Sequence, residues 1–511
     1  MPGKRDYAQI PKGSGINRSM FDISENHKTT FNGDYLIPIY WDYFYPGEIV
    51  RGSIQAFVRV HSPLDYPIMD NMRLTIHWYA VALRNLWTNF RKFYGERVDP
   101  GDSIDYSIPE LGSAAAFPTD VASGDLQADL FKYMGVPVVP TTGIDEADFS
   151  ALPFRAYNQI YNWHYRDQQQ QDSVDELLDD GPDDGTTYVI RKRGKRHDYL
   201  TSALLAPQRG ESVTIGGEVG SDAAVGADVT IWSTPGSDWR ELDAGGPNTR
   251  ISATTGASTD KLYPNTTINE LRNATAIQQF LERDNRYGQR FDEQILAHFG
   301  VEFNDLRIEP LFLGGGSGYI NTTTIPNQSA TTGNLGDLSA IAHGALDGAR
   351  FTYAFDEPCI LMCIANVSAD ISYQRSVQKK HSLRTRYDMF YPEFARIGDQ
   401  AVLTQEVYYA NAAADTNVFG YVPRYEHMRI GFNRVTGEFN SHLTSGSLDP
   451  WHLAEELGST PVLGTLWIQA STPYDRIQAV TTAHDFIGDF NINLRAARAL
   501  PVFGVPGMAR L

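Results

Sequence analysis

The amino-acid sequence predicts a mainly β protein in which a small number of strands is separated by long loops. Apolar and polar residues alternate in three separate segments, at residues 50–60, 72–83 and 485–496. A period of two is typical of a strand with one buried face. Long aperiodic stretches lie between these segments, although compact domains rarely place so much chain in loops. Lids of enzymes and subunit contacts of shell-forming proteins are two functions that use such loops.

Residues 68–95 are the segment around which we expect the rest of the chain to be organised. One face of its strand is deeply apolar, with Leu74, Ile76 and Trp78, and the opposite face is half-buried. Aromatic residues at helical spacing follow directly, and Gly95 supplies a stop signal. The pattern predicts a strand that leads into an aromatic-faced helix, and it indicates core rather than a functional site.

The remaining strands are shorter. A strand at 35–41 contains Pro38, which favours the edge of a sheet because proline cannot donate a ladder hydrogen bond. We expect further strands at 359–373 and 475–481, with a loop-rich stretch after residue 317.

Helical periodicity appears in three places and predicts helices at 126–134, 152–167 and 266–299. Pro153 suits a first helical turn, and Gly300 is a typical terminator. The last residues, 500–507, contain two prolines and predict an extended tail.

Composition narrows the classes of function. No apolar run approaches the roughly 18 residues that a membrane helix needs, and residues 1–6 show no signal-peptide pattern. We therefore expect neither membrane residence nor secretion. The two cysteines, Cys359 and Cys363, lie four apart in a predicted strand. We interpret them as small buried hydrophobic residues rather than as a disulfide or a metal site.

Local motifs for catalysis or metal binding are absent from the sequence. All 12 histidines are isolated, and no His-x-His, Cys-x-x-Cys, Walker A or Gly-x-Ser-x-Gly pattern occurs. The glycine run at 314–318 does not match a dinucleotide-binding fingerprint. The acidic turn at 179–185 lacks the oxygen spacing of an EF-hand loop, so a solvated turn is the preferred interpretation. We predict no enzyme activity, no catalytic residue, no metal site and no cofactor.

Charge is distributed unevenly along the chain, whose net charge is −19. Residues 99–184 contain 18 acidic and three basic residues, a local charge of −15. Residues 1–20 form a basic arm, in which the basic residues are Lys4, Arg5, Lys12 and Arg18. A net acidic chain argues against nucleic-acid binding on every face, but it is compatible with one basic face.

Two further basic clusters suggest a polyanion partner. The first is 191–196, and the second consists of Arg375, Lys379, Lys380, Arg384 and Arg386. Tyr387, Phe390 and Tyr391 adjoin the second cluster, and basic residues interleaved with aromatics can hold phosphates while bases stack. The alternative interpretation is salt bridges to the acidic loops or to a neighbouring subunit.

Several segments, taken in order, form a set that spans nearly the whole chain. They include Leu-Pro-Phe-Arg-Ala-Tyr-Asn at 152–158, Lys-Arg-His-Asp-Tyr-Leu-Thr-Ser at 195–202, Phe-Leu-Gly-Gly-Gly-Ser at 312–317 and Pro-Val-Phe-Gly-Val-Pro-Gly at 501–507. Others lie at 28–40, 67–72, 166–168, 384–388, 418–421 and 451–453. The ordered set resembles the major capsid proteins of the Microviridae, the small icosahedral single-stranded DNA phages, and especially their gokushovirus-like branch.

The resemblance implies a single eight-stranded antiparallel jelly roll with very long loop and helical insertions. Its core would comprise residues 21–165 and 311–511, with a large insertion at 166–310. That insertion would hold a variable surface excursion at about 210–260, which departs most from the family, and helices at about 266–299. The resemblance also implies a T=1 icosahedral shell that encloses a circular single-stranded DNA genome, and it offers no catalytic residues.

The same resemblance implies the partners and the location. The expected partners are other copies of the chain, the genome on the inner face, minor virion proteins such as a small DNA-binding or pilot protein, and a host surface receptor through the outer loops. The expected location is the virion, after assembly in the host cytoplasm. We predict that the basic arm and the 375–386 cluster face the interior and that the 99–184 loops lie outside or at rims. Two alternatives stay open: a β-sandwich module that binds a host receptor or a glycan, and a hydrolase with dispersed residues.

Overall fold

The structure is a computed structural model that describes residues 17–112, 126–137, 149–211, 213, 268–287, 290–301, 309–326, 338–443 and 448–502. The chain divides into two compact units, one formed by Met1–Leu205 with Phe303–Leu511 and the other by Ala206–Glu302. Most of the basic arm and nearly all of the 210–260 excursion lie outside the described residues. The boundaries expected for the core and the insertion stay a prediction.

The first unit is built on an antiparallel sheet with the strand order β1-β13-β4-β9-β8-β5-β10-β3, in which β2 also pairs with β13. Its strands are β1 (Ser19–Asp22), β2 (Glu25–Phe31), β3 (Ile37–Phe44), β4 (Ile49–Val60), β5 (Met72–Ala82), β8 (Leu311–Pro326), β9 (Leu338–Ala354), β10 (Cys359–Ala369) and β13 (Phe486–Arg498). Because β1 and β2 pair with successive parts of β13, the nine strands occupy eight strand positions.

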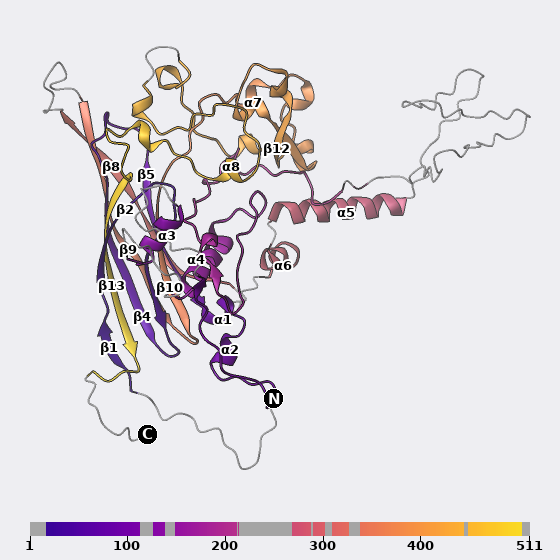
Figure 1. Cartoon of the computed structure of the whole chain (residues 1–511). Helices are drawn as coiled ribbons and strands as arrows, with labels where there is room; N and C mark the ends of the chain where they lie inside the picture. The colour runs from indigo at the N-terminus through magenta and orange to yellow at the C-terminus, as the bar shows by residue number, and fades with distance from the viewer. Residues whose placement is uncertain are drawn as a thin grey trace, which may run out of the picture. The chain divides into compact units, whose positions relative to one another are not determined.

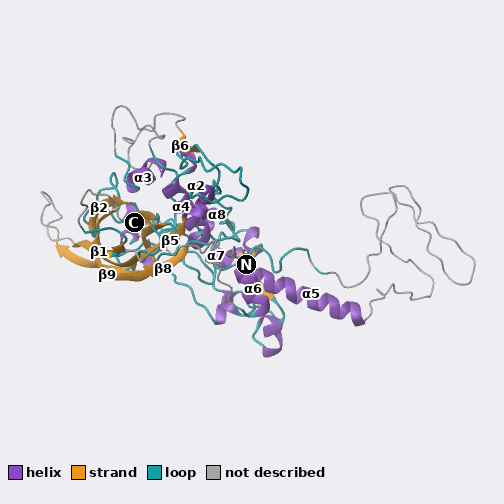
Figure 2. Ribbon diagram, turned by 90° about the horizontal axis from the view of Figure 1, so that it is seen from below, coloured by secondary structure: helices purple, strands orange, loops and turns teal. Residues whose placement is uncertain are grey.

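The sheet consists of two four-position halves joined by one hairpin. The first half-sheet is β1/β2-β13-β4-β9, and the second half-sheet is β8-β5-β10-β3. Strand β8 changes partner along its length, since its first part pairs with β5 and its last part pairs with β9. The halves curl toward each other (Figures 1 and 2), which gives the order and layering of a jelly roll, as the resemblance implied.

The core between the two half-sheets is centred on Trp78 of β5. Its indole Nε1 donates a hydrogen bond of 2.8 Å to the carbonyl oxygen of Ala349 in β9. Its ring lies 4.9 Å from that of Phe351 and 5.9 Å from that of Tyr40. Trp78 therefore contacts strands of both halves, and this confirms the prediction that its face of the 68–95 segment is core.

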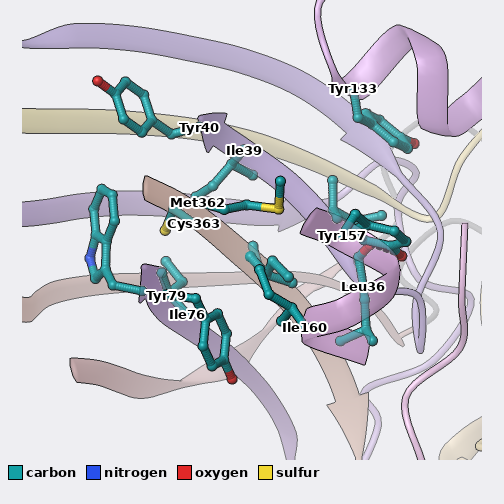
Figure 3. Packing of buried hydrophobic residues seen from close by; sticks show 14 of the residues in the cluster. Leu36, Ile39, Tyr40, Ile76, Tyr79, Tyr133, Tyr157, Ile160, Met362 and Cys363 are labelled. Atoms are coloured by element: carbon teal, nitrogen blue, oxygen red, sulfur yellow. Dashed lines mark hydrogen bonds between the residues drawn. The ribbon is translucent and has the colours of Figure 1, made fainter. Parts of the chain in front are cut away.

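The outward face of the second half-sheet is covered by helix. The helices here are α1 (Leu83–Leu86), α2 (Phe90–Phe93), α3 (Leu126–Tyr133) and α4 (Leu152–Ile160), and a π turn, Tyr161–Tyr165, continues α4. Every residue of α4 is buried. Tyr157 of α4 donates a hydrogen bond of 2.9 Å to the carbonyl oxygen of Leu36, and Ile160 lies among side chains of the half-sheet (Figure 3). The outward faces of β5 and β10 are thus largely removed from water, whereas β8 keeps exposed side chains such as Phe312 and Tyr319.

The chain between β10 and β13, together with residues 199–203, forms a smaller subdomain with its own core around Trp467, Tyr199 and Phe419. Its regular elements are β11 (Asp399–Leu403), β12 (Val418–Pro423), α7 (Thr404–Val407) and α8 (Thr465–Ile468). A parallel pair, β6 (Leu111–Gly112) and β7 (Asp183–Asp184), joins two segments of the long connection after β5.

The structure confirms most of the predicted elements. Strands β4, β5, β10 and β13 and helices α3 and α4 lie where the sequence predicts them, and β3 is an edge strand as Pro38 indicated. Both cysteines are free and buried, as expected.

Three predictions of local structure are wrong. The stretch after residue 317 is not loop-rich but forms β8 and β9, because these small residues pair into the sheet despite weak β propensity. Residues 475–481 contain a 3₁₀ turn and a single bridge from Gln478 to Leu64 rather than a strand. The predicted aromatic helix is two short helices, α1 and α2, although Gly95 ends the second one with a φ of 95°.

The second unit is described by α5 (Ile268–Tyr287) and α6 (Phe291–Phe299), which confirm the predicted helical region. The ring of Phe280 stacks on His298 with centroids 4.5 Å apart, and His298 also contacts Asp284. Gly300 ends α6 in the left-handed conformation, as its position indicated.

We expect Trp78→Ala to lower the free energy of unfolding by about 3–5 kcal/mol, because it removes a fully buried ring that touches both half-sheets. Chemical denaturation of the purified chain measures this. The control is Tyr387→Ala, at a side chain that is 66% exposed, which should change stability by less than about 0.5 kcal/mol. Equal effects of the two substitutions would contradict the central role of Trp78.

Candidate assembly and nucleic-acid surfaces

The 191–196 cluster is largely used inside the subunit. Lys195 is the most buried of its charges, with its Nζ 2.6 Å from the carboxylate of Glu455 and 4.6 Å from the ring centre of Trp467. Arg196 pairs with Asp370 at 3.2 Å, and Lys192 lies over the ring of Tyr35. These contacts use several of the cluster's charges inside the subunit, but their acidic partners, Glu455 and Asp370, do not belong to the 99–184 loops.

Arg193 and Arg196 nevertheless line an open groove of about 360 Å³ on the outward face of the second half-sheet. Arg73 of β5 lines it as well, and Gly315 and Gly316 of β8 form part of its wall. The glycine run at 314–318 therefore belongs to a strand, and a Cβ at Gly315 would come within 2.8 Å of the Ile76 carbonyl oxygen. Arg73 was not among the basic residues predicted to be functional, although its position on the half-buried face of β5 placed it beside Thr75.

Two of the guanidinium groups in this groove have neutral partners. Arg73 donates to the hydroxyl of Tyr319 at 2.6 Å, and Arg193 donates to the side-chain oxygen of Asn366 at 3.4 Å. Burial, together with the positive charge of Arg193, lowers the pKa of His77 to about 4, so its ring is neutral at neutral pH. The groove can hold an anion such as a carboxylate or a phosphate.

The structure divides the 375–386 cluster into two parts. Arg375 donates to the hydroxyl of Tyr408 at 2.7 Å and lies over that ring. Lys379 pairs with the carboxylate of Glu406 at 3.0 Å and also donates to a backbone carbonyl. The side chain of Glu406 is fully buried, and it also accepts a hydrogen bond from Tyr199. Arg375 and Lys379 thus have structural contacts within the subunit.

The second part is exposed. Lys380, Arg384 and Arg386 are exposed, and so are the neighbouring rings of Tyr387 and Phe390. The guanidinium of Arg386 lies 6.0 Å from the ring centre of Tyr391. This part keeps the interleaving of basic and aromatic side chains that the sequence showed.

Of the basic residues of the arm, only Arg18 lies among the described residues. Arg18 is exposed and lies directly before β1, whereas Lys4, Arg5 and Lys12 lie outside the described residues. The arm therefore joins the subunit at an edge of the first half-sheet, where β1 pairs with β13.

The acidic turn at 179–185 is structural in part. The guanidinium of Arg155 donates to Asp183 at 2.7 Å from Nε and 2.5 Å from Nη2, with both side chains 1% exposed. Asp180 accepts from the indole of Trp87 at 2.6 Å. Among the residues that the structure describes, no group of three or more potential ligands could hold a metal ion. No helix in the described part is long and apolar enough to span a membrane.

A jelly roll with long connections is one of the architectures that viral capsid proteins use, although lectin and cupin domains share it. Comparison with known proteins supports the first of these classes. Residues 8–508 match the family described as "Capsid protein (F protein)", so the chain belongs to this phage capsid protein family. Its role is structural and not enzymatic.

Three relatives cover nearly the full length of the chain. Capsid protein VP1 of Chlamydia phage 1 is 31% identical over 99% of this chain and 98% of its own length. The capsid protein VP1 of Bdellovibrio phage phiMH2K is 32% identical over 98% and 97%, respectively. The capsid protein VP1 of Spiroplasma virus 4 is 28% identical over the same shares. These findings confirm the family that the ordered sequence segments resembled.

We expect Lys379→Met to destabilise the subunit by about 3 kcal/mol, because it leaves the buried carboxylate of Glu406 without its cation. This is the lower end for a broken buried pair, because the Lys379 side chain is 17% exposed. The neighbouring Lys380→Met, at an exposed position, should change stability by less than about 0.5 kcal/mol. Thermal denaturation of both variants measures the difference, and similar melting temperatures would contradict the structural assignment of Lys379.

Proposed function

We propose that this capsid protein assembles into a T=1 icosahedral shell that encloses a circular single-stranded DNA genome. The observation that carries the proposal is a jelly-roll core whose long connections make up much of the chain, together with membership of the phage capsid family. Copies of the chain are then the principal partner. A β-sandwich module that binds a receptor or a glycan is the weaker candidate. The reason is that this chain matches capsid proteins over nearly their full length.

The charge distribution supports a sided shell. The proposal places the basic arm, with Lys4, Arg5, Lys12 and Arg18, on the inner face. It also places there the exposed part of the 375–386 cluster, whereas Arg375 and Lys379 contribute through their contacts inside the subunit. Acidic residues of 99–184 lie outside or at rims in this arrangement. Minor virion proteins bind inside, a host receptor is bound by outer loops, and assembly takes place in the host cytoplasm.

Particles purified from infected cells test the shell. Negative-stain microscopy should show closed particles of uniform diameter, and the enclosed nucleic acid should resist nuclease and then be degraded by a single-strand-specific nuclease after release. A chain that stays monomeric in the virion fraction, or particles that enclose duplex DNA or RNA, would reject the proposal.

We expect Lys380→Glu, Arg384→Glu and Arg386→Glu together to reduce the DNA content of assembled particles and to make packaging more sensitive to salt, because phosphates lose their cations. The ratio of absorbance at 260 and 280 nm in purified particles measures this. A matched set of charge reversals at the exposed residues Arg91, Arg97 and Arg396 is the control. Unchanged DNA content and salt response in the first set would remove this cluster from the genome-facing surface.

A further inference from the structure

The first half-sheet has an outward face that the described residues leave uncovered. Along β4 the burial alternates strictly, with Val58 and Ile54 inside and Arg59, Phe57 and Gln55 outside. The corresponding face of the second half-sheet is covered by α4 and its π turn (Figure 1). We call the uncovered side the bare face. Its outward polar and charged side chains include those of Asp22, Asn26, Lys28, Thr30, Arg51, Ser53, Gln55, Arg59, His343, Asp347, Arg350, Asp489, Asn491, Asn493 and Arg495. Its outward apolar side chains include those of Met20, Ile49, Phe57, Ile341, Ala345 and Ile487.

Strand register arranges the bare face into rows. One row runs Asn26, Asn491, Gln55 and Asp347 across four strands, and the amide nitrogen of Asn491 lies 3.5 Å from the side-chain oxygen of Gln55. Amide side chains carry both donors and acceptors, so such a row can hydrogen-bond to the edges of different bases.

The adjacent row holds an exposed aromatic ring. Phe57 is 46% exposed, and its ring centre lies 6.2 Å from that of His343. Phe57 and the amide row line a shallow depression of about 520 Å³, together with Asp489. One carboxylate oxygen of Asp489 is buried and has no hydrogen-bond partner among the described residues. A flat base can lie against this ring while one of its N–H groups donates to Asp489.

Charge on the bare face has the opposite sign to that of the whole chain. The face carries five basic residues against three acidic ones, although the chain has a net charge of −19. Arg51 and Arg495 are directly opposite each other in β4 and β13, a placement that is destabilising for like charges. The basic residues are Lys28, Arg51, Arg59, Arg350 and Arg495, and the acidic residues are Asp22, Asp347 and Asp489.

Most of these cations have no strong partner within the subunit. Lys28, Arg51, Arg59 and Arg495 form no ion pair within 4.0 Å to any residue that the structure describes, and Arg350 has only a 3.9 Å contact to Asp347. The basic arm, residues 1–20, also reaches the subunit at the edge of this same half-sheet, through β1. Unpaired cations around a polar, aromatic depression are complementary to an extended chain of phosphates with free bases.

We propose that the bare face is a binding platform for single-stranded DNA, with bases on Phe57 and the amide row and phosphates at Lys28, Arg51, Arg59 and Arg495. This deepens the proposed function and rests on it, because it assigns the genome a surface on the shell subunit. Single strands are favoured over a duplex, since only unpaired bases can present a face to Phe57.

Binding of a fluorescent oligothymidylate to the unassembled full-length chain tests the platform. Combining Arg51→Gln, Arg59→Gln and Arg495→Gln should reduce the slope of log affinity against log salt by about 2, at roughly 0.7 per lost phosphate contact. Phe57→Thr keeps a strand-forming residue and should weaken binding about five-fold or more through lost stacking. The control is the triple Arg→Gln substitution at Arg97, Arg396 and Arg434, which are exposed elsewhere and should leave affinity and slope unchanged.

The outcomes separate this inference from the proposed function. Ultraviolet cross-linking of intact particles should attach DNA to the peptide that contains Phe57. Particles that hold single-stranded DNA but give unchanged binding, slope and cross-links in the platform variants would overturn the platform and leave the shell intact. Platform variants that bind DNA normally but no longer assemble would identify the bare face as a contact between subunits. Wild-type particles without single-stranded DNA would reject the proposed function itself.

Discussion

The jelly roll depends on the contact that Trp78 makes across its interior. Trp78 belongs to β5 in the second half-sheet, yet its indole reaches the backbone of Ala349 and the ring of Phe351 in the first half-sheet. A buried indole N–H needs an acceptor, so the hydrogen bond fixes the orientation of a ring that fills much of the space between the layers. The hairpin of β8 and β9, which carries the chain from one half to the other, is thereby held at a fixed spacing.

One outer face of the sandwich is covered by helix and the other is not, because the two faces carry different kinds of side chain. On the second half-sheet the outward positions include Tyr79, Val81 and Met362, which are 2% exposed or less. An apolar outer face has to be buried, and the buried helix α4 does this. On the first half-sheet the outward positions are mainly amides, hydroxyls and charges, with a few separate apolar side chains such as Ile49 and Phe57. Most of this face can therefore stay in water. The same fold therefore provides one side that supports the long connections and one side that stays available for a polar partner.

The sequence allowed the strands with clean alternation to be predicted, and the physical reason is visible in the structure. β4 and β13 have one face in the core and one in water, so their pattern follows the pleat. β8 and β9 were missed because glycine, threonine and alanine carry little hydrophobic contrast, and their pairing with β5 and β4 compensates for weak propensity. The ion pairs of the basic clusters could not be predicted either. The partner carboxylates, Glu406 for Lys379 and Glu455 for Lys195, lie far away in the sequence.

Local placement of charge, and not the overall balance of 62 acidic and 43 basic residues, determines where this chain can present a positive surface. Arg155, Lys195 and Lys379 each meet a carboxylate inside the subunit, and these cations are removed from the surface charge. An external partner interacts with the charges that are left outside these pairs, and the sign of those charges differs between surfaces. Around Arg51 of β4 and Arg495 of β13 this charge is positive, because the two arginines lie opposite each other and a single acidic residue, Asp22, lies opposite Arg495. Local strand register, rather than net charge, therefore sets where this acidic protein attracts an anion.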